Sequence, residues 1–218
     1  ARLQPLADFP KVRMAFTFFF RDLHVLDLVV QHAAPMLVGR SYPRVWDAGC
    51  AMGPEPYSLA ILFAEKLGPF AFRNLRILAT DLDDTGTFGG IIAAGVYPDP
   101  ELERTPPELR ARYFESAAEP GSSRVIERIR DRVRFEQHDL LSLQSVGGGF
   151  SLVLCKNVLL HFSAAQRVEV IRMYHASLAA GGLFAMEQTQ KLPDEVSHLF
   201  ERVVADAQLY RRREVGCA

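Results

Sequence analysis

The stretch R-V-W-D-A-G-C-A-M-G-P-E-P-Y-S, residues 44–58, predicts a strand that passes through a glycine-bearing turn into a helix. Its first apolar residues can form a short buried strand. Gly49 and Gly53 permit a tight turn and a close approach of backbone to a ligand, and Pro56 suits the first turn of a helix. Backbone N–H groups at the start of the following helix, residues 57–67, would face whatever lies over the loop. The stretch therefore predicts a loop that holds a small ligand at a helix N-terminus.

Length and composition indicate one globular domain. The chain has 218 residues, of which 49% are hydrophobic and 23% charged, enough for one full core. Its 25 basic and 26 acidic residues leave a net charge of -1, which provides no overall field for nucleic acid or an anionic membrane. No apolar run approaches the roughly 18 residues of a membrane span, and the first residues lack a signal-peptide layout. Cys50, Cys155 and Cys217 match no metal-site spacing, so we expect reduced thiols, no metal and a cytoplasmic protein that is not membrane-embedded.

Strands and helices alternate along the chain, which predicts an α/β fold with a parallel sheet. After the first strand, further strands are expected at residues 75–81, 133–140, 150–155, 183–187 and 208–215. Besides the helix at 57–67, helices are expected at residues 17–37, 105–114, 164–180 and 193–207. Three glycines should interrupt a helix at 84–95, because each costs up to about 1 kcal/mol of helix propensity. Residues 124–136 alternate apolar and charged side chains, which predicts a hairpin or three short strands.

An acidic pair, Asp81 and Asp83, follows the strand at residues 75–81. A carboxylate at the end of the second strand of a strand–helix–strand unit is placed to accept hydrogen bonds from ribose hydroxyls. The alternative is that Asp81 caps the next helix, a common role for aspartate. Spacing alone leaves both roles open.

Seven short motifs occur in order between residues 17 and 162. They are T-F-F-F-R-D (17–22), E-P-Y-S-L-A (55–60), A-T-D-L-D (79–83), A-G-V-Y (94–97), L-R-A-R-Y-F (109–114), H-D-L-L (138–141) and C-K-N-V-L-L-H-F (155–162). Together they resemble the chemotaxis receptor methyltransferase family, CheR, over residues 17–211. The resemblance implies a class I S-adenosylmethionine-dependent methyltransferase fold: α/β, Rossmann-like, with a seven-stranded, mostly parallel sheet. It also implies a small β-subdomain inserted at about residues 115–136.

The same resemblance implies an activity. Members of the family use S-adenosylmethionine to methylate glutamate side chains of chemoreceptors, leaving γ-glutamyl methyl esters and S-adenosylhomocysteine. We therefore expect a protein-glutamate O-methyltransferase whose partner is the cytoplasmic domain of a chemoreceptor, contacted through the β-subdomain. Residues 1–38 would form a lead and a helix that close the cofactor pocket, and residues 39–218 the methyltransferase domain. Because sixteen residues precede Thr17 in this sequence, we expect little of the family's N-terminal helical domain within it.

Site residues carry over by position from the resemblance. The expected cofactor-binding residues are Thr17, Arg21, Gly49, Glu55, Asp81, Leu82, Asp139, Leu140, Cys155, Lys156 and Asn157. Thr17 and Arg21 stand four apart, so on a helical turn both would point the same way. Arg21 is also a catalytic candidate. His161, which replaces a tyrosine of the family near the reaction centre, is the second.

The expected chemistry requires little from the protein beyond alignment. A glutamate carboxylate has a reference pKa near ~4.3, so at neutral pH it accepts a methyl group without a general base. Two alternatives stay open. One is an enzyme of the same fold that acts on a small molecule or another protein, with His161 as a base. The other is a catalytically silent module that binds the cofactor or its product and uses the arginine-rich insertion to hold a partner.

Overall fold

The main sheet has seven strands in the order β6-β2-β1-β7-β8-β10-β9 in a computed structural model that describes residues 17–214. Neighbours from β6 to β8 are parallel, and β10 runs antiparallel to both β8 and β9. The seven-stranded, mostly parallel sheet is thus confirmed. The bounds are β1 Arg44–Ala48, β2 Arg76–Asp81, β6 Val133–Gln137, β7 Phe150–Cys155, β8 Leu178–Met186, β9 Phe200–Arg202 and β10 Leu209–Arg212.

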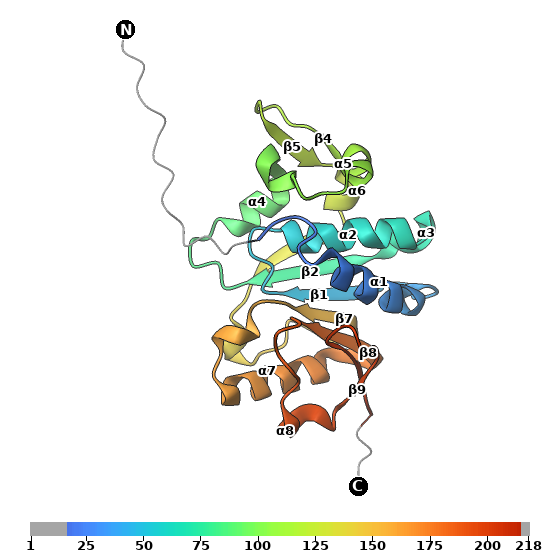
Figure 1. Cartoon of the computed structure of the whole chain (residues 1–218), viewed down its shortest axis with the longest axis vertical. Coiled ribbons are helices and arrows are strands. Elements are labelled where there is room, and N and C mark those ends of the chain that lie inside the picture. The colour runs from blue at the N-terminus through green and yellow to red at the C-terminus, as the bar shows by residue number, and fades with distance from the viewer. Residues whose placement is uncertain (1–16, 215–218) are drawn as a thin grey trace.

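Helices cover both faces of this sheet (Figure 1). On one face, α1 (Leu23–Leu37) and α2 (Pro54–Lys66) pack together, with α3 (Pro69–Asn74) following α2. On the other face lies α7 (Ala164–Ser177), which begins with the capping box of Ser163 and Gln166. Side chains alternate along a strand, so Val45 of β1 enters the core under α1 and α2, whereas Trp46 enters the core under α7. The main sheet therefore separates two apolar cores.

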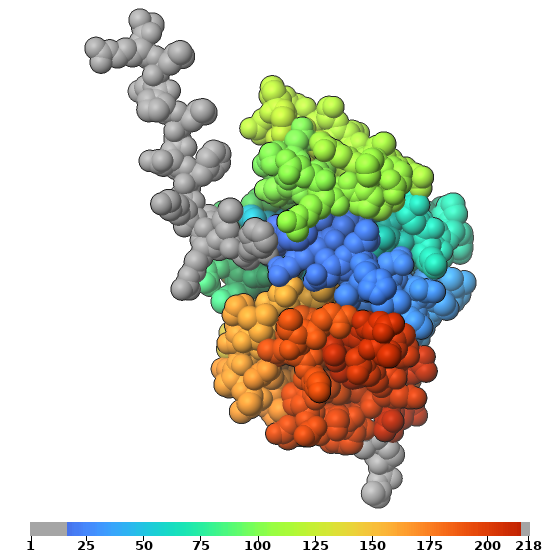
Figure 2. Space-filling model, viewed as in Figure 1, coloured from blue at the N-terminus to red at the C-terminus, as the bar shows by residue number. Residues whose placement is uncertain are grey.

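A three-stranded antiparallel sheet forms the small subdomain, in the order β3-β5-β4. Its elements are β3 Val96–Pro98, η1 Asp99–Leu102, α5 Pro107–Tyr113, β4 Phe114–Ser116, β5 Ser122–Val125 and α6 Glu127–Arg130. Figure 2 shows this green subdomain stacked above the blue N-terminal segment. The ring of Phe19 meets those of Tyr97 and Phe114 edge-on, at centroid distances of 4.9 and 5.1 Å. Aromatic packing thus joins the segment to the subdomain.

The subdomain boundaries differ from the expected insertion at residues 115–136. Its sheet begins earlier, at Val96, and residues 133–137 belong to the main sheet. Strands were also the wrong expectation for the middle of 124–136, where α6 forms a single helical turn. Ile129 explains this turn, because it is fully buried while the charged residues beside it remain accessible.

Two expected helices were misplaced. The helix at residues 17–37 begins only at Leu23, because Phe20 and Asp22 have left-handed φ values of 57° and 55°. The helix at 193–207 is wrong: α8 covers only Asp194–Ser197, and the buried Phe200 starts β9.

The glycine-rich segment does form a helix, α4 (Phe88–Ala94), but only after Gly86. Gly89 lies inside α4 against the ring of Phe135, where an added Cβ would stand 3.0 Å from Cδ1. Glycine at this position lowers the helix propensity of α4, but it allows the helix to pack closely on β6. The short turns η2 (Leu140–Ser142) and η3 (Leu159–His161) complete the described elements. Among residues 17–214, no helix has both the length and the apolar character to cross a membrane.

Candidate functional site

A cavity of about 560 Å³ opens at the carboxyl ends of β1, β2, β6 and β7. This edge is where ligands bind in open parallel sheets, because the connecting loops diverge there. Of the expected site residues, the cavity is lined by Thr17, Arg21, Gly49, Glu55, Asp81, Leu82, Asp139, Leu140, Lys156, Asn157 and His161. Segments far apart in the sequence therefore meet around one space.

The loop after β1 is fixed to the end of β2 by its backbone. The N–H groups of Gly49 and Cys50 both donate to the carbonyl of Thr80, at 2.7 and 3.0 Å. Gly49 has φ 95°, and an added Cβ would stand 2.1 Å from Cγ2 of Val158. Only glycine fits this conformation and this contact, so the loop brings bare backbone to the cavity wall.

Asp83, rather than Asp81, caps the following helix. The Asp83 carboxylate accepts hydrogen bonds from the backbone N–H groups of Thr87 (3.1 Å) and Phe88 (3.0 Å) at the start of α4. Oδ2 of Asp81 instead accepts the N–H of Ala51 at 2.8 Å, and its residue lines the cavity. The helix-capping alternative for Asp81 is therefore wrong. Its carboxylate is anchored to the ligand loop, with acceptor capacity left over.

One end of the cavity is bounded by apolar side chains. Leu82 and Leu141 are exposed at its rim, and Leu140 is buried beneath them. One carboxylate oxygen of Asp139 accepts the N–H of Leu141 at 2.8 Å. This hydrogen bond fixes the turn that carries Leu140 and Leu141. His138 also lines the cavity, and burial lowers its pKa, which favours the neutral ring. This end suits a flat, weakly polar group.

Lys156 fastens the segment before α1 to the rest of the site. Its side chain is 1% exposed, and Nζ lies 3.1 Å from the carboxylate of Asp22 and 3.3 Å from that of Glu55. The same ammonium group donates to the backbone carbonyl of Arg21 at 3.3 Å. Thr17 and Arg21 thus reach the cavity through a braced turn, although the helical turn expected for them does not form.

A buried carboxyl group, Asp47, lies behind this wall. It is fully buried on β1, and burial, followed by the charge of Glu55, raises its pKa well above the usual range, although Lys156 opposes the shift. The strand pattern of residues 44–48 does not by itself mark residue 47 as part of a site. An aspartate in the middle of an otherwise apolar strand was the signal that could have identified it.

Comparison with known proteins decides the family. The family described as CheR methyltransferase, SAM binding domain, matches residues 15–209, nearly the whole chain. This chain belongs to the CheR methyltransferase family. Its relatives include chemotaxis protein methyltransferase 1 of Pseudomonas aeruginosa, 35% identical over 189 residues that cover 82% of this chain and 68% of that protein.

Other relatives of this CheR family member carry similar descriptions. Chemotaxis protein methyltransferase 2 of Pseudomonas aeruginosa is 34% identical over 190 residues, 86% of this chain and 66% of that protein. A probable chemotaxis protein methyltransferase of Rhizobium etli is 26% identical over 207 residues, 92% of this chain and 76% of that protein. The chain thus spans about two thirds to three quarters of the length of these CheR relatives.

Cys155 is the one expected site residue that does not line the cavity of this CheR domain. Its side chain is fully buried in the core on the α7 face, and burial raises the pKa of its thiol. Cys50 and Cys155 are both free thiols, and Cys217 lies outside the described residues. Position alone could not tell which face of β7 residue 155 occupies.

Several lining residues were not among the expected site residues, although most of them lie within the quoted motifs at residues 138–141 and 155–162, because a motif does not show which of its side chains face the cavity. They are Cys50, Ala51, His138, Leu141, Val158, Leu160 and Phe162. His161 is exposed at the cavity rim, in η3. Across residues 17–214, no three His, Cys, Asp or Glu side chains are grouped so that they could hold a metal ion.

Proposed function

We propose that this chain binds S-adenosylmethionine in the cavity and transfers its methyl group to glutamate side chains of a chemoreceptor. The observation that carries the proposal is the role of Asp81, which is anchored to the ligand loop while the neighbouring Asp83 caps α4. Although Oδ1 of Asp81 also accepts the N–H of Asp83 at 3.4 Å, the carboxylate keeps acceptor capacity for a ligand with vicinal hydroxyls. Membership of the CheR family supports the choice of cofactor.

The residues of the cavity fit that cofactor in three ways. Asp81 would accept hydrogen bonds from the ribose hydroxyls, and the leucine-bounded end would cover the adenine. Gly49 lets backbone pass beneath the ligand, and Glu55 would attract the cationic amino group of the methionine part. The bound cofactor supplies a methyl group activated by a positively charged sulfur. The protein holds and orients the two reactants.

The acceptor carboxylate would be oriented by Arg21. A guanidinium group can form paired hydrogen bonds with a carboxylate and so fix its plane. Because the acceptor is already ionised at neutral pH, alignment and exclusion of water would provide most of the acceleration. Lys156 supports this arrangement, since it holds the Arg21 carbonyl against α2 through Glu55. His161, exposed at the rim, would contact the acceptor segment rather than remove a proton.

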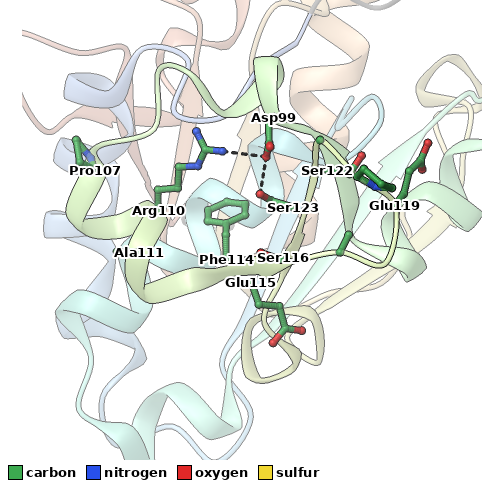
Figure 3. Close-up of a pocket in the computed structure, with 13 residues that line it drawn as sticks. Asp99, Pro107, Arg110, Ala111, Phe114, Glu115, Ser116, Glu119, Ser122 and Ser123 are labelled. Carbon is green, nitrogen blue, oxygen red and sulfur yellow. Dashed lines mark hydrogen bonds and ion pairs between the residues drawn. The ribbon is translucent and has the colours of Figure 1, made fainter.

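A second hollow supports a receptor contact on the small sheet. It measures about 610 Å³ and lies beside β4 and the β4–β5 hairpin. Figure 3 shows Asp99 bonded to both Arg110, at 2.9 Å, and Ser123, at 2.6 Å, beside the ring of Phe114. Because β4 is an edge strand, its outer backbone groups could pair with an extended receptor peptide. The docking surface proposed here is this edge and the adjoining hollow.

Calorimetric titration with S-adenosylhomocysteine tests the cofactor, and transfer of labelled methyl to a receptor fragment tests the reaction. Saturable binding with Asp81-dependent affinity is the expected result. A product label released by mild alkali would identify a methyl ester, whereas an alkali-stable label would indicate another acceptor. Failure to bind either S-adenosylmethionine or S-adenosylhomocysteine would contradict the proposal.

A matched pair of variants separates docking from catalysis. Arg110→Ala on the small sheet should weaken binding of the receptor fragment while leaving calorimetric affinity for S-adenosylhomocysteine unchanged. Arg21→Ala should instead affect the reaction itself, with a large loss of turnover even when the receptor fragment is saturating. Unchanged receptor binding in Arg110→Ala would rule out the hollow beside Asp99 as the docking surface.

A further inference from the structure

Asp47 is a buried carboxyl group that stands behind the cavity wall. It belongs to the central strand β1, where it pairs with Ala79 of β2 and Leu154 of β7. By the alternation along β1, its side chain shares the face of Val45, under α1 and α2. Apolar neighbours therefore flank Asp47 within the sheet, and the start of α2 provides its polar surroundings through Glu55.

The contact between Asp47 and Glu55 requires a proton. No N–H or hydroxyl group of the described residues donates to either oxygen of Asp47. The side chain within hydrogen-bonding range is the carboxyl group of Glu55. Two ionised carboxylates are acceptors only, so they can bond to each other only when one of them is protonated.

The charges around the pair favour this protonated form. Lys156 is the buried ammonium group here, and it is already shared between Glu55 and Asp22. Asp81 adds another negative charge from the end of β2. Burial also raises the pKa of the neighbouring titratable groups of this cluster, which are Cys50 of the loop, Cys155 of β7, Tyr174 of α7 and Glu187 after β8. Lys156 is engaged by Glu55 and Asp22, and no hydrogen bond from it reaches either oxygen of Asp47, so the buried Asp47 carboxyl group favours its neutral form.

We propose that Asp47 is a positioning residue that shares one proton with Glu55 in the free protein and releases it when a ligand ammonium group occupies the Glu55 end of the cavity. This inference rests on the proposed function, which places the amino group of the cofactor there. On binding, the O–H bond of the carboxyl group breaks, the proton passes to the buffer, and the new negative charge faces the ammonium group. The shared proton also holds Glu55 toward the sheet before the ligand arrives.

Proton release makes affinity depend on pH. When binding releases a proton, the affinity rises with pH, by up to about tenfold per pH unit. We expect this rise for wild-type protein and S-adenosylhomocysteine over the pH range in which Asp47 of the free protein keeps its proton and the ligand amino group is also protonated. Calorimetry in two buffers with different ionisation enthalpies counts the protons directly. A release approaching one proton per ligand is the expected result.

Two comparisons assign the proton to Asp47. Asp47→Asn keeps the size of the side chain and offers an amide N–H to Glu55, but it cannot release a proton. Its affinity should be nearly independent of pH, with no buffer dependence of the binding enthalpy. Glu187→Gln is the matched control, because Glu187 is also buried at a strand end and burial raises its pKa. This control should keep the proton release of the wild type.

A ligand comparison needs no variant at all. 5′-Methylthioadenosine, which has the nucleoside but no amino-acid part, should bind the wild-type protein without releasing a proton. The inference would be overturned if proton release persisted in Asp47→Asn or were lost only in Glu187→Gln. It would also be overturned if S-adenosylhomocysteine and 5′-methylthioadenosine released equal numbers of protons. Binding of S-adenosylhomocysteine with no proton release would overturn it while leaving the proposed function in place. If the protein bound neither S-adenosylmethionine nor S-adenosylhomocysteine, both the inference and the proposed function would be contradicted.

Discussion

Asp81 and Asp83 are two residues apart, but their substitution should have different effects. A change of Asp81 should lower the affinity for the cofactor, whereas a change of Asp83 should lower the stability of the fold. Asp81→Asn preserves an oxygen that can accept the Ala51 N–H, but it removes the charge offered to the ligand. Loss of a charged hydrogen bond costs about 1.5 to 3 kcal/mol, which corresponds to about 10- to 150-fold in Kd for S-adenosylhomocysteine. The melting temperature should change little, because the loop anchor remains.

Asp83→Ala provides the contrast. It removes the acceptor for two N–H groups at the start of α4 and should cost about 1 to 2 kcal/mol of folding stability. For a domain of this size, that cost lowers Tm by roughly 2 to 8 °C. Calorimetric titration and thermal unfolding of both variants provide the assay. Native affinity in Asp81→Asn, or an equal loss of affinity in Asp83→Ala without a change in Tm, would refute the division of roles.

Four further changes test other parts of the site. Arg21→Ala should lower turnover at saturating cofactor by at least about tenfold while Kd for S-adenosylhomocysteine changes much less; equal losses in both would contradict acceptor orientation. Gly49→Ala should destabilise the fold by more than about 1 kcal/mol in urea unfolding, since φ is 95° and the new Cβ meets Val158. Lys156→Met should lower Tm and turnover together, because it leaves Glu55 without its buried counter-charge. The stability of wild type relative to Asp47→Asn should fall in urea unfolding as the pH rises above about 4, because the folded carboxyl keeps a proton that the unfolded chain has lost.

Local patterns in the sequence predicted most of the main sheet. The apolar run at 150–155 became the fully buried β7, and the Ser163 capping box starts α7 as expected. The C-terminal elements were predicted less well. Residues 193–207 have an apolar spacing compatible with a helix, but burial of Phe200 against α7 and β10 favours a strand there. Tertiary packing overrode a weak local preference.

Site residues could be predicted from the sequence where a motif marks a loop. They could not be predicted where contacts between distant parts of the chain determine the role of a side chain. Gly49 follows from the strand–loop–helix pattern, and the same pattern places Asp81 at the end of the next strand without deciding its role. The division of labour between Asp81 and Asp83 could not be inferred, because it depends on which carboxylate reaches the start of α4. Lys156 meets Asp22 across more than 130 positions of sequence, so no local pattern indicates its brace. Asp47 was overlooked because strand periodicity treats it as one more inward position.

Methyl transfer to a chemoreceptor fragment tests the central claim most directly. The measurement is incorporation of label from S-adenosylmethionine into a purified cytoplasmic fragment, followed by mild alkali treatment, with a fragment whose candidate glutamates are changed to alanine as the control. We predict label that depends on Arg21, is absent from the control fragment and is released by alkali as methanol. Incorporation of alkali-stable label, or none in a protein that binds S-adenosylhomocysteine, would contradict the account.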